Sequence, residues 1–239
     1  MGVDLVNALK LLELREKTKM QGRLLQIGRQ GFHVRRGELT ILQEQCEKLG
    51  VAFDIEAIRQ NNMYSEPFFE ALGFDHCESV DASDFEGCTY VHDMNTSPPD
   101  RLVGRYDFVL DGGTTEHIFN VPSAFNNVFR FLKTNGYFYS VNGANGYFGH
   151  GFYQFSPELP WSFWHRNCGL EVIDCVAMPA NHTVPSIAIP DPKALGKRAE
   201  PRLPPGRVYL CYTVQKTARS KWRVGAQQSD YVAQWVNAS

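Results

Sequence analysis

The chain has little excess charge of either sign. Its 239 residues carry 24 Lys and Arg against 26 Asp and Glu, a net charge of −2. Nucleic acids and anionic lipids attract strongly basic surfaces, so neither kind of partner is indicated. Long apolar runs are also missing, because Asp4, Lys10, Glu13 and Arg15 interrupt the N-terminal segment too often for a signal peptide or a membrane span. We therefore expect a cytoplasmic protein with no membrane partner.

Disulfide and metal-binding patterns are absent as well. The six cysteines are scattered and form no C-x-x-C pair, so we expect reduced thiols. The seven histidines show no metal-ligand spacing, and we expect no metal.

The chain also lacks a complete glycine-rich motif. In "GRLLQIGRQGFH" (22–33) a short apolar run ends in a glycine turn, as the first strand of a nucleotide-binding fold does. The acidic residue and the middle glycine that are usual in such turns are not there. The turn is therefore either a modified cofactor site or one that no longer binds.

The rest of the chain alternates between helical and strand-like segments, which favours one α/β domain over residues 1–239. The spacing of apolar residues predicts an N-terminal helix within 1–20 and further helices at 38–49, 64–73 and 157–168. Strands are predicted at 23–28, 77–80, 88–92, 106–113, 170–178 and 207–215.

The clearest unit covers residues 106–143. "YDFVLDGG" reads as a strand, and an amphipathic helix follows, with Pro122 at its start, Lys133 in its last turn and Asn135-Gly136 at its end. "YFYSVNG" (137–143) is the next buried strand. This βαβ pattern predicts a parallel sheet with right-handed crossovers.

The last strand, 207–215, alternates apolar residues and suits a sheet edge. Before it, the segment 179–206 holds seven of the thirteen prolines. We interpret it as an extended flap over the substrate side of the domain.

Residues 106–143 resemble the second half of class I S-adenosylmethionine-dependent methyltransferases. In that family a "FD-x-V" strand leads through an "E-H" turn to a helix that ends "R-x-L-K-x-G-G". Tyr106–Val109, Glu116-His117 and Arg130–Gly136 follow this frame. The resemblance implies a three-layer, Rossmann-like α/β methyltransferase fold, with a mostly parallel seven-stranded sheet and an antiparallel last strand. Ligands of such sheets lie at the carboxyl ends of the strands.

The resemblance also implies a site for S-adenosylmethionine, with S-adenosylhomocysteine or methylthioadenosine as product. Gln26 stands where the family's first motif has its acid, and Gly28 is kept, with Arg29 and Gln30 beside the cofactor. Asp81 matches the ribose-binding acid. The remaining cofactor positions are Asp93 and Met94 beside the adenine, and Asp111 and Gly112 near the sulfonium.

Four residues are candidates for acting on the acceptor. His117 and His150 are possible general bases, because histidine titrates near neutral pH. Asn142 is a candidate for holding the acceptor or the methionine carboxylate, and the Tyr153 ring for contacting the cation. For each of them a purely structural role is the alternative.

The predicted function is methyl transfer to a small polar metabolite or sugar-like acceptor. One alternative is non-methyl use of S-adenosylmethionine that releases methylthioadenosine, for example cyclisation to azetidine-2-carboxylate, which a neutral Gln26 favours. The other is a non-catalytic binding protein on the same fold. The sequence leaves the oligomeric state open, with a homodimer as one option.

Overall fold

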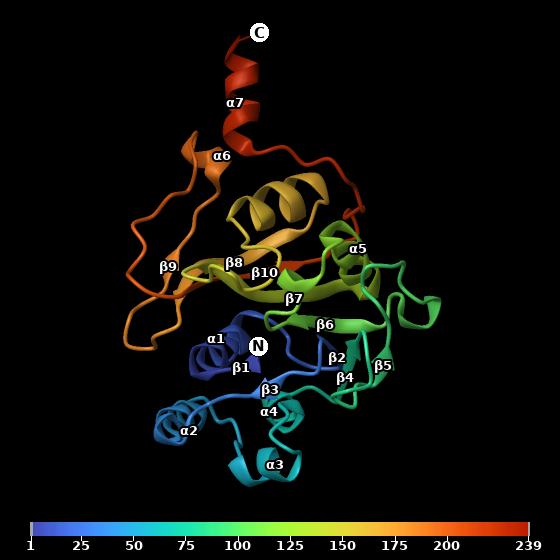
Figure 1. Cartoon of the computed structure of the whole chain (residues 1–239), viewed down its shortest axis with the longest axis vertical. Helices are drawn as coiled ribbons and strands as arrows, with labels where there is room; N and C mark the ends of the chain where they lie inside the picture. Colours follow the sequence, from blue (N-terminus) through green and yellow to red (C-terminus); the bar gives the residue numbers. More distant parts are fainter. Residues whose placement is uncertain (1, 239) are drawn as a thin grey trace.

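The computed structural model describes residues 2–238 and has three layers around one main sheet (Figure 1). The eight strands of this sheet run in the order β5-β4-β2-β6-β7-β10-β8-β9. Their bounds are β2 Arg23–Ile27, β4 His76–Asp81, β5 Tyr90–Val91, β6 Tyr106–Asp111, β7 Leu132–Asn145, β8 Glu171–Pro179, β9 Ile187–Ala188 and β10 Val208–Gln215. Strands β5, β4, β2, β6 and β7 are mutually parallel, whereas β10 is antiparallel to both of its neighbours.

Helices cover both faces of this sheet. One face carries α1 Leu5–Lys17, α2 Leu39–Lys48, α3 Ile55–Gln60 and α4 Glu66–Leu72, and the other carries α5 Val121–Phe131 and the π-helix η4 Leu159–Asn167 (Figure 1). Short 3-10 turns are η1 Arg36–Glu38, η2 Asp100–Leu102 and η3 Thr115–His117. Helix α6 Pro192–Leu195 lies beside α7 Ser229–Ala238, which projects away from the sheet (Figure 1).

Alternate residues of the central strands feed two separate cores. Leu24, Phe108 and Leu110 pack with the helices α1 to α4, whereas Leu25 and Val109 pack with α5 and η4. This alternation follows from the two-residue period of a strand, and burial on both faces explains why these strands read as continuous apolar runs. The three-layer α/β prediction is confirmed.

The prediction for the last strand is partly wrong. Strand β10 is antiparallel, as expected, but it lies between β7 and β8 and not at the sheet edge. The alternation of Val208 and Leu210 describes only one face of this strand. Cys211 and Thr213 on the other face are also fully buried. A strand buried on both faces belongs inside a sheet.

The sheet also has one strand more than predicted. The eighth strand, β9, comes from the proline-rich segment 179–206 and pairs with β8 at the sheet edge. Ile189, directly after it, is buried. The middle of this segment is therefore fastened to the sheet.

The boundary after α5 also differs from the sequence reading. The helix ends at Phe131, and Lys133 binds Asp107 at 2.8 Å instead of the last helical turn. The distant Lys216 takes that place, since its Nζ donates to the carbonyl groups of Phe129 and Leu132 at 2.7 and 2.8 Å. The carbonyl groups at a helix end need a hydrogen-bond donor from outside the helix. Sequence order does not identify Lys216 as this donor, because it lies far along the chain.

One small sheet alters the route of the chain after β2. Strand β3 Gly31–Phe32 pairs in parallel with β1 Gly2–Val3, so the chain does not enter a helix directly after the Gly28 turn. Phe32 is buried and stacks 5.9 Å from the ring of Phe53. The nearest helix, α2, starts only at Leu39. The glycine turn is therefore not followed directly by a helix N-terminus.

Candidate functional site

The carboxyl ends of β2 and β6 meet at the Gly28 turn. Gly28 has a φ of 70°, a left-handed conformation that favours glycine. A β-carbon here would also lie 2.7 Å from Oγ1 of Thr114, in the loop after β6. Both facts explain the glycine, and they show how closely the two loops approach each other.

The buried side chain of Gln30 lies between the Gly28 turn and Gly112, and we call the space that it fills the crevice. Its Nε2 donates to the carbonyl groups of Ile27 at 2.8 Å and Gly28 at 3.1 Å. Its Oε1 lies against Gly112, where it would collide with any β-carbon. This oxygen is buried and has no hydrogen-bond partner among the described residues. Such an orphaned acceptor is costly, and a donor from a ligand would satisfy it.

An acidic side chain, Glu66, lies beside Gln26. Oε1 of Gln26 accepts from the Gln30 amide at 3.0 Å, and Nε2 of Gln26 lies 3.4 Å from Oε1 of Glu66. Glu66 belongs to α4 and also binds Arg29 at 2.8 Å. A carboxylate thus stands beside the position where the family's first motif has one. No sequence pattern marks Glu66, because it comes from a separate helix.

Arg29 contacts residues of three different segments. Besides Glu66 it contacts the carbonyl of Glu86 at 2.9 Å, and its guanidinium lies 3.9 Å from the centre of the Tyr64 ring. Arg29 therefore joins the glycine turn to the loop after β4.

The three residues expected at the nucleoside end differ in their surroundings. Asp81 is half-buried at the end of β4, and its Oδ1 accepts from the Ala82 amide at 2.6 Å. Asp93 is exposed, and its carboxylate closes a turn with Asn95 through contacts of 2.9 and 2.7 Å, which hold the pKa of Asp93 below its usual value. Met94 is buried in the core beside α5. Among these residues, Asp81 has the greatest capacity to accept further hydrogen bonds.

Asp111 and Asn142 form a buried polar cluster. Oδ1 of Asp111 accepts from the backbone amides of Thr114 at 2.8 Å and Thr115 at 3.2 Å. Its Oδ2 accepts from Nδ2 of Asn142 at 2.7 Å and from the hydroxyl groups of Thr115 and Ser140. Both side chains are buried and already paired. Asp111 therefore shapes the loop after β6, with Gly112 at its start.

Glu116, His117 and His150 come together at the open end of β7. The Glu116 side chain is fully buried, and its Oε2 accepts from the Gly143 amide at 2.6 Å. Its Oε1 lies 3.2 Å from Nε2 of His150 and 3.7 Å from Nε2 of His117. Burial raises the pKa of the Glu116 carboxyl to about 7, and the charge of Asp111 adds to this effect. Burial also lowers the pKa of His117, with His150 as a further cause.

Tyr153 lies next to this group but does not point its hydroxyl into it. The hydroxyl donates to the Phe119 carbonyl at 2.7 Å, and the ring stacks on Phe155. Three exposed aromatic residues belong to the same two loops as the histidines: Phe119 and Phe152, whose rings are in edge contact at 5.6 Å, and Phe148, which is fully exposed. We call these three residues the aromatic rim; exposed rings of this kind suit contact with a planar or apolar part of an acceptor.

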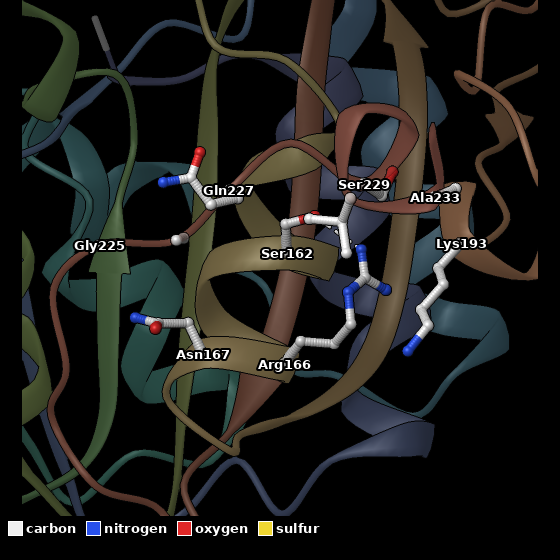
Figure 2. Close-up of a pocket in the computed structure, with 10 residues that line it drawn as sticks. Ser162, Arg166, Asn167, Lys193, Gly225, Gln227, Ser229 and Ala233 are labelled. Carbon is white, nitrogen blue, oxygen red and sulfur yellow. Dashed lines mark hydrogen bonds between the residues drawn. The ribbon is translucent and has the colours of Figure 1, made fainter. Parts of the chain in front are cut away.

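A pocket lies elsewhere in the molecule. It has a volume of about 590 Å³ and is lined by residues of η4, α6, α7 and the segment 225–227. Figure 2 shows Arg166 and Ser162 of η4 facing Ser229, with Lys193 at the side. The guanidinium of Arg166 is already paired with Asp191 at 2.5 Å. None of the residues that line it is one of those expected to bind cofactor or acceptor, so size alone does not locate the site.

Two further sequence predictions can be compared with the structure. All six cysteines are free thiols. Within residues 2–238, the helices are too short or too polar to cross a lipid bilayer.

No family model matches the chain, and no curated protein matches it. Solved structures do resemble it. A putative methyltransferase from Bacillus halodurans is 11% identical over 89% of this chain and 99% of its own, with a TM-score of 0.46. The 1,6-didemethyltoxoflavin-N1-methyltransferase of Burkholderia thailandensis, solved with S-adenosylhomocysteine, is 15% identical over 88% and 76%, with a TM-score of 0.41. The [4+2]-cyclase SpnF is 14% identical over 87% and 80%, with a TM-score of 0.44.

Several solved structures that resemble this chain are thus methyltransferases. At identities of 11 to 15% and TM-scores of 0.41 to 0.46, they carry no argument about substrate or residue roles. The function is argued below from the residues of this chain.

Proposed function

We propose that the protein is an S-adenosylmethionine-dependent methyltransferase that acts on a small acceptor. The observation that carries this proposal is the strand order. An antiparallel β10 lies between β7 and β8, and polar residues gather at the carboxyl ends of β2, β4, β6 and β7. Ligands of open α/β sheets bind at these ends.

The residues fit the cofactor unequally. Asp81 suits the ribose hydroxyls, because a carboxylate accepts two hydroxyl donors at once. At the other end, the Gln30 side chain fills the crevice and has to turn aside before the methionine part can enter. When bound, S-adenosylmethionine supplies an electrophilic methyl group and needs no metal for that purpose.

The chain then orients the acceptor and removes its proton. His117, with a side chain 45% exposed, can take a proton from an acceptor hydroxyl. Nε2 of His150 is buried against Glu116, so His150 can do so only through its other ring nitrogen. The aromatic rim of Phe119, Phe148 and Phe152 would hold an apolar part of the acceptor. The acceptor class remains a small polar or sugar-like metabolite.

Binding of S-adenosylhomocysteine, followed by calorimetry, tests the proposal. We expect one site per chain. Asp81→Asn should weaken binding by about 1.5–3 kcal/mol, the scale of a hydrogen bond to a charged group. Asp84→Asn, in the exposed loop that follows β4, is the control and should bind normally. Equal affinity in both variants would remove Asp81 from the ribose site, and absence of binding in the unmodified protein would refute the proposal.

Glu66 bears on the alternative of non-methyl use. Cyclisation requires the uncharged amine of the methionine part, and a neutral Gln26 alone would permit it. The Glu66 carboxylate beside Gln26 instead favours a charged ammonium, which is a poor nucleophile. We therefore favour methyl transfer. The protein should form little methylthioadenosine from S-adenosylmethionine alone, as mass spectrometry can measure; steady acceptor-independent formation would reverse this choice.

The filled crevice favours the other alternative, a non-catalytic binding protein. If Gln30 holds its present place permanently, the cofactor has no room at its methionine end. The Gln30 variant developed in the Discussion distinguishes these two functions.

A further inference from the structure

The strongest unassigned feature is the arrangement of donor atoms at Glu116, His117 and His150. One carboxylate oxygen and one ring nitrogen from each histidine lie within 4.8 Å of one another. Metal-bound donors about 2.1 Å from an ion are separated by roughly 3–3.5 Å in tetrahedral or octahedral sites. The separations of 3.2 and 3.7 Å from Glu116 Oε1 are close to this range.

The contacts within this group are not those of a satisfied hydrogen-bonded cluster. Although Glu116 Oε1 and His150 Nε2 are 3.2 Å apart, their orientation does not make a hydrogen bond, and both atoms are buried and without a partner among the described residues. These two potential ligand atoms lie close together with no hydrogen bond between them. Both are therefore free to bind a third atom, such as a metal ion.

The surroundings also fix the proposed ligands. The Gly143 amide holds the other oxygen of Glu116 at 2.6 Å, so Oε1 has a defined direction. Backbone contacts attach the His150 loop to the same point, since the amides of Phe152 and Tyr153 donate to the Glu116 carbonyl at 2.8 and 3.2 Å. Residues 34 positions apart in the chain are thereby kept together, which explains why histidine spacing in the sequence gives no sign of a site.

We propose that Glu116, His117 and His150 bind one divalent transition-metal ion of the Zn²⁺ or Co²⁺ type. Two imidazoles and one carboxylate suit such borderline ions better than Mg²⁺, which prefers oxygen ligands. Three protein ligands leave at least one coordination position open, as in catalytic and not structural sites. Both histidine side chains are partly exposed, which leaves such an open position within reach of a ligand from solvent.

Only the use of the ion rests on the proposed function. In methyl transfer, an acceptor hydroxyl at the open position would be held in place, and its lowered pKa would let it give its proton to solvent water. The histidines would then serve as ligands, which replaces the general-base role given to them above. Metal binding itself requires neither cofactor nor acceptor.

The test is a titration of metal-free protein with Co²⁺, followed by its visible absorption, and with Zn²⁺ by calorimetry. We expect one ion per chain. Glu116→Gln, His117→Ala and His150→Ala should each weaken binding by at least tenfold, with folding checked by circular dichroism. The control is His182→Ala, an exposed histidine in the proline-rich segment, which should bind as the unmodified protein does.

Three results would overturn the proposal. They are no stoichiometric binding by the unmodified protein, binding in the Glu116 and His150 variants as tight as in the unmodified protein, and loss of binding in the His182 variant. Binding of S-adenosylhomocysteine is measured separately in the same samples. A protein that binds the nucleoside but no metal would refute only this site, and the reverse result would refute only the proposed cofactor.

Discussion

Gln30→Ala tests whether the crevice between Gly28 and Gly112 is a cofactor site kept closed by one side chain. In the unmodified protein, entry of the methionine part breaks the two hydrogen bonds from Gln30 to the carbonyls of Ile27 and Gly28. Each such bond contributes about 0.5–1.5 kcal/mol net, so their loss opposes binding by about 1–3 kcal/mol. Alanine makes neither bond and leaves the crevice open.

We therefore expect Gln30→Ala to bind S-adenosylhomocysteine roughly 5- to 150-fold more tightly, as calorimetry can show. Gln43→Ala, an exposed glutamine on α2, is the control and should bind as the unmodified protein does. Weaker binding in Gln30→Ala would mean that the orphaned oxygen contacts the ligand directly. No binding in either form would support the non-catalytic alternative.

A second substitution checks the same geometry without any ligand. A β-carbon at Gly112 collides with Gln30, so Gly112→Ala should lower the free energy of unfolding by about 1–3 kcal/mol. In a Gln30→Ala background the collision is gone, and Gly112→Ala should then cost much less. Additive effects in denaturant unfolding would show that the two residues are not in contact.

Two further expectations concern stability and exposure. Burial opposes ionisation of Glu78, but Arg23 at 2.7 Å and Tyr90 at 2.9 Å outweigh it and lower the pKa of this carboxyl. The contribution of Glu78 to the free energy of unfolding is therefore present above the usual pKa of 4.5 and is lost as the pH falls through the lower folded value. The difference in stability between the unmodified protein and Glu78→Gln should shrink on acidification. A difference that stays constant with pH would refute the assignment. Trypsin should cut first at Lys197, in the exposed end of the proline-rich segment, because β9 fastens its middle to the sheet, and a first cut before residue 190 would contradict this view.

The sequence predicted the parts of the fold whose signals are local. The βαβ unit of 106–143 was found because its strand, helix and strand each show their own apolar period within a few residues. The position of β10 was not, since strand order depends on partners far along the chain. The same reason explains why Lys216, and not Lys133, binds the end of α5.

The candidate site divides along the same line. Asp81 and Asp111 can be proposed from the sequence because each lies at the end of a strand-like run. Glu66 was missed, since it meets Gln26 across 40 residues. Glu116 was recognised only as part of a motif beside His117. Its contact with His150 depends on how the loop after β7 folds back, which periodicity and spacing do not describe.

The position of β10 has a consequence for how the chain assembles. Strands β7 and β8 are both complete before residue 180, yet they do not pair with each other; each pairs instead with Val208–Gln215. During synthesis, β8 and the edge strand β9 therefore lack their link to the rest of the sheet until that segment has emerged. The half with β5, β4, β2, β6 and β7 has its pairings earlier. A late strand thus joins the two halves, and until it arrives both β7 and β8 present unpaired edges that invite association with other chains.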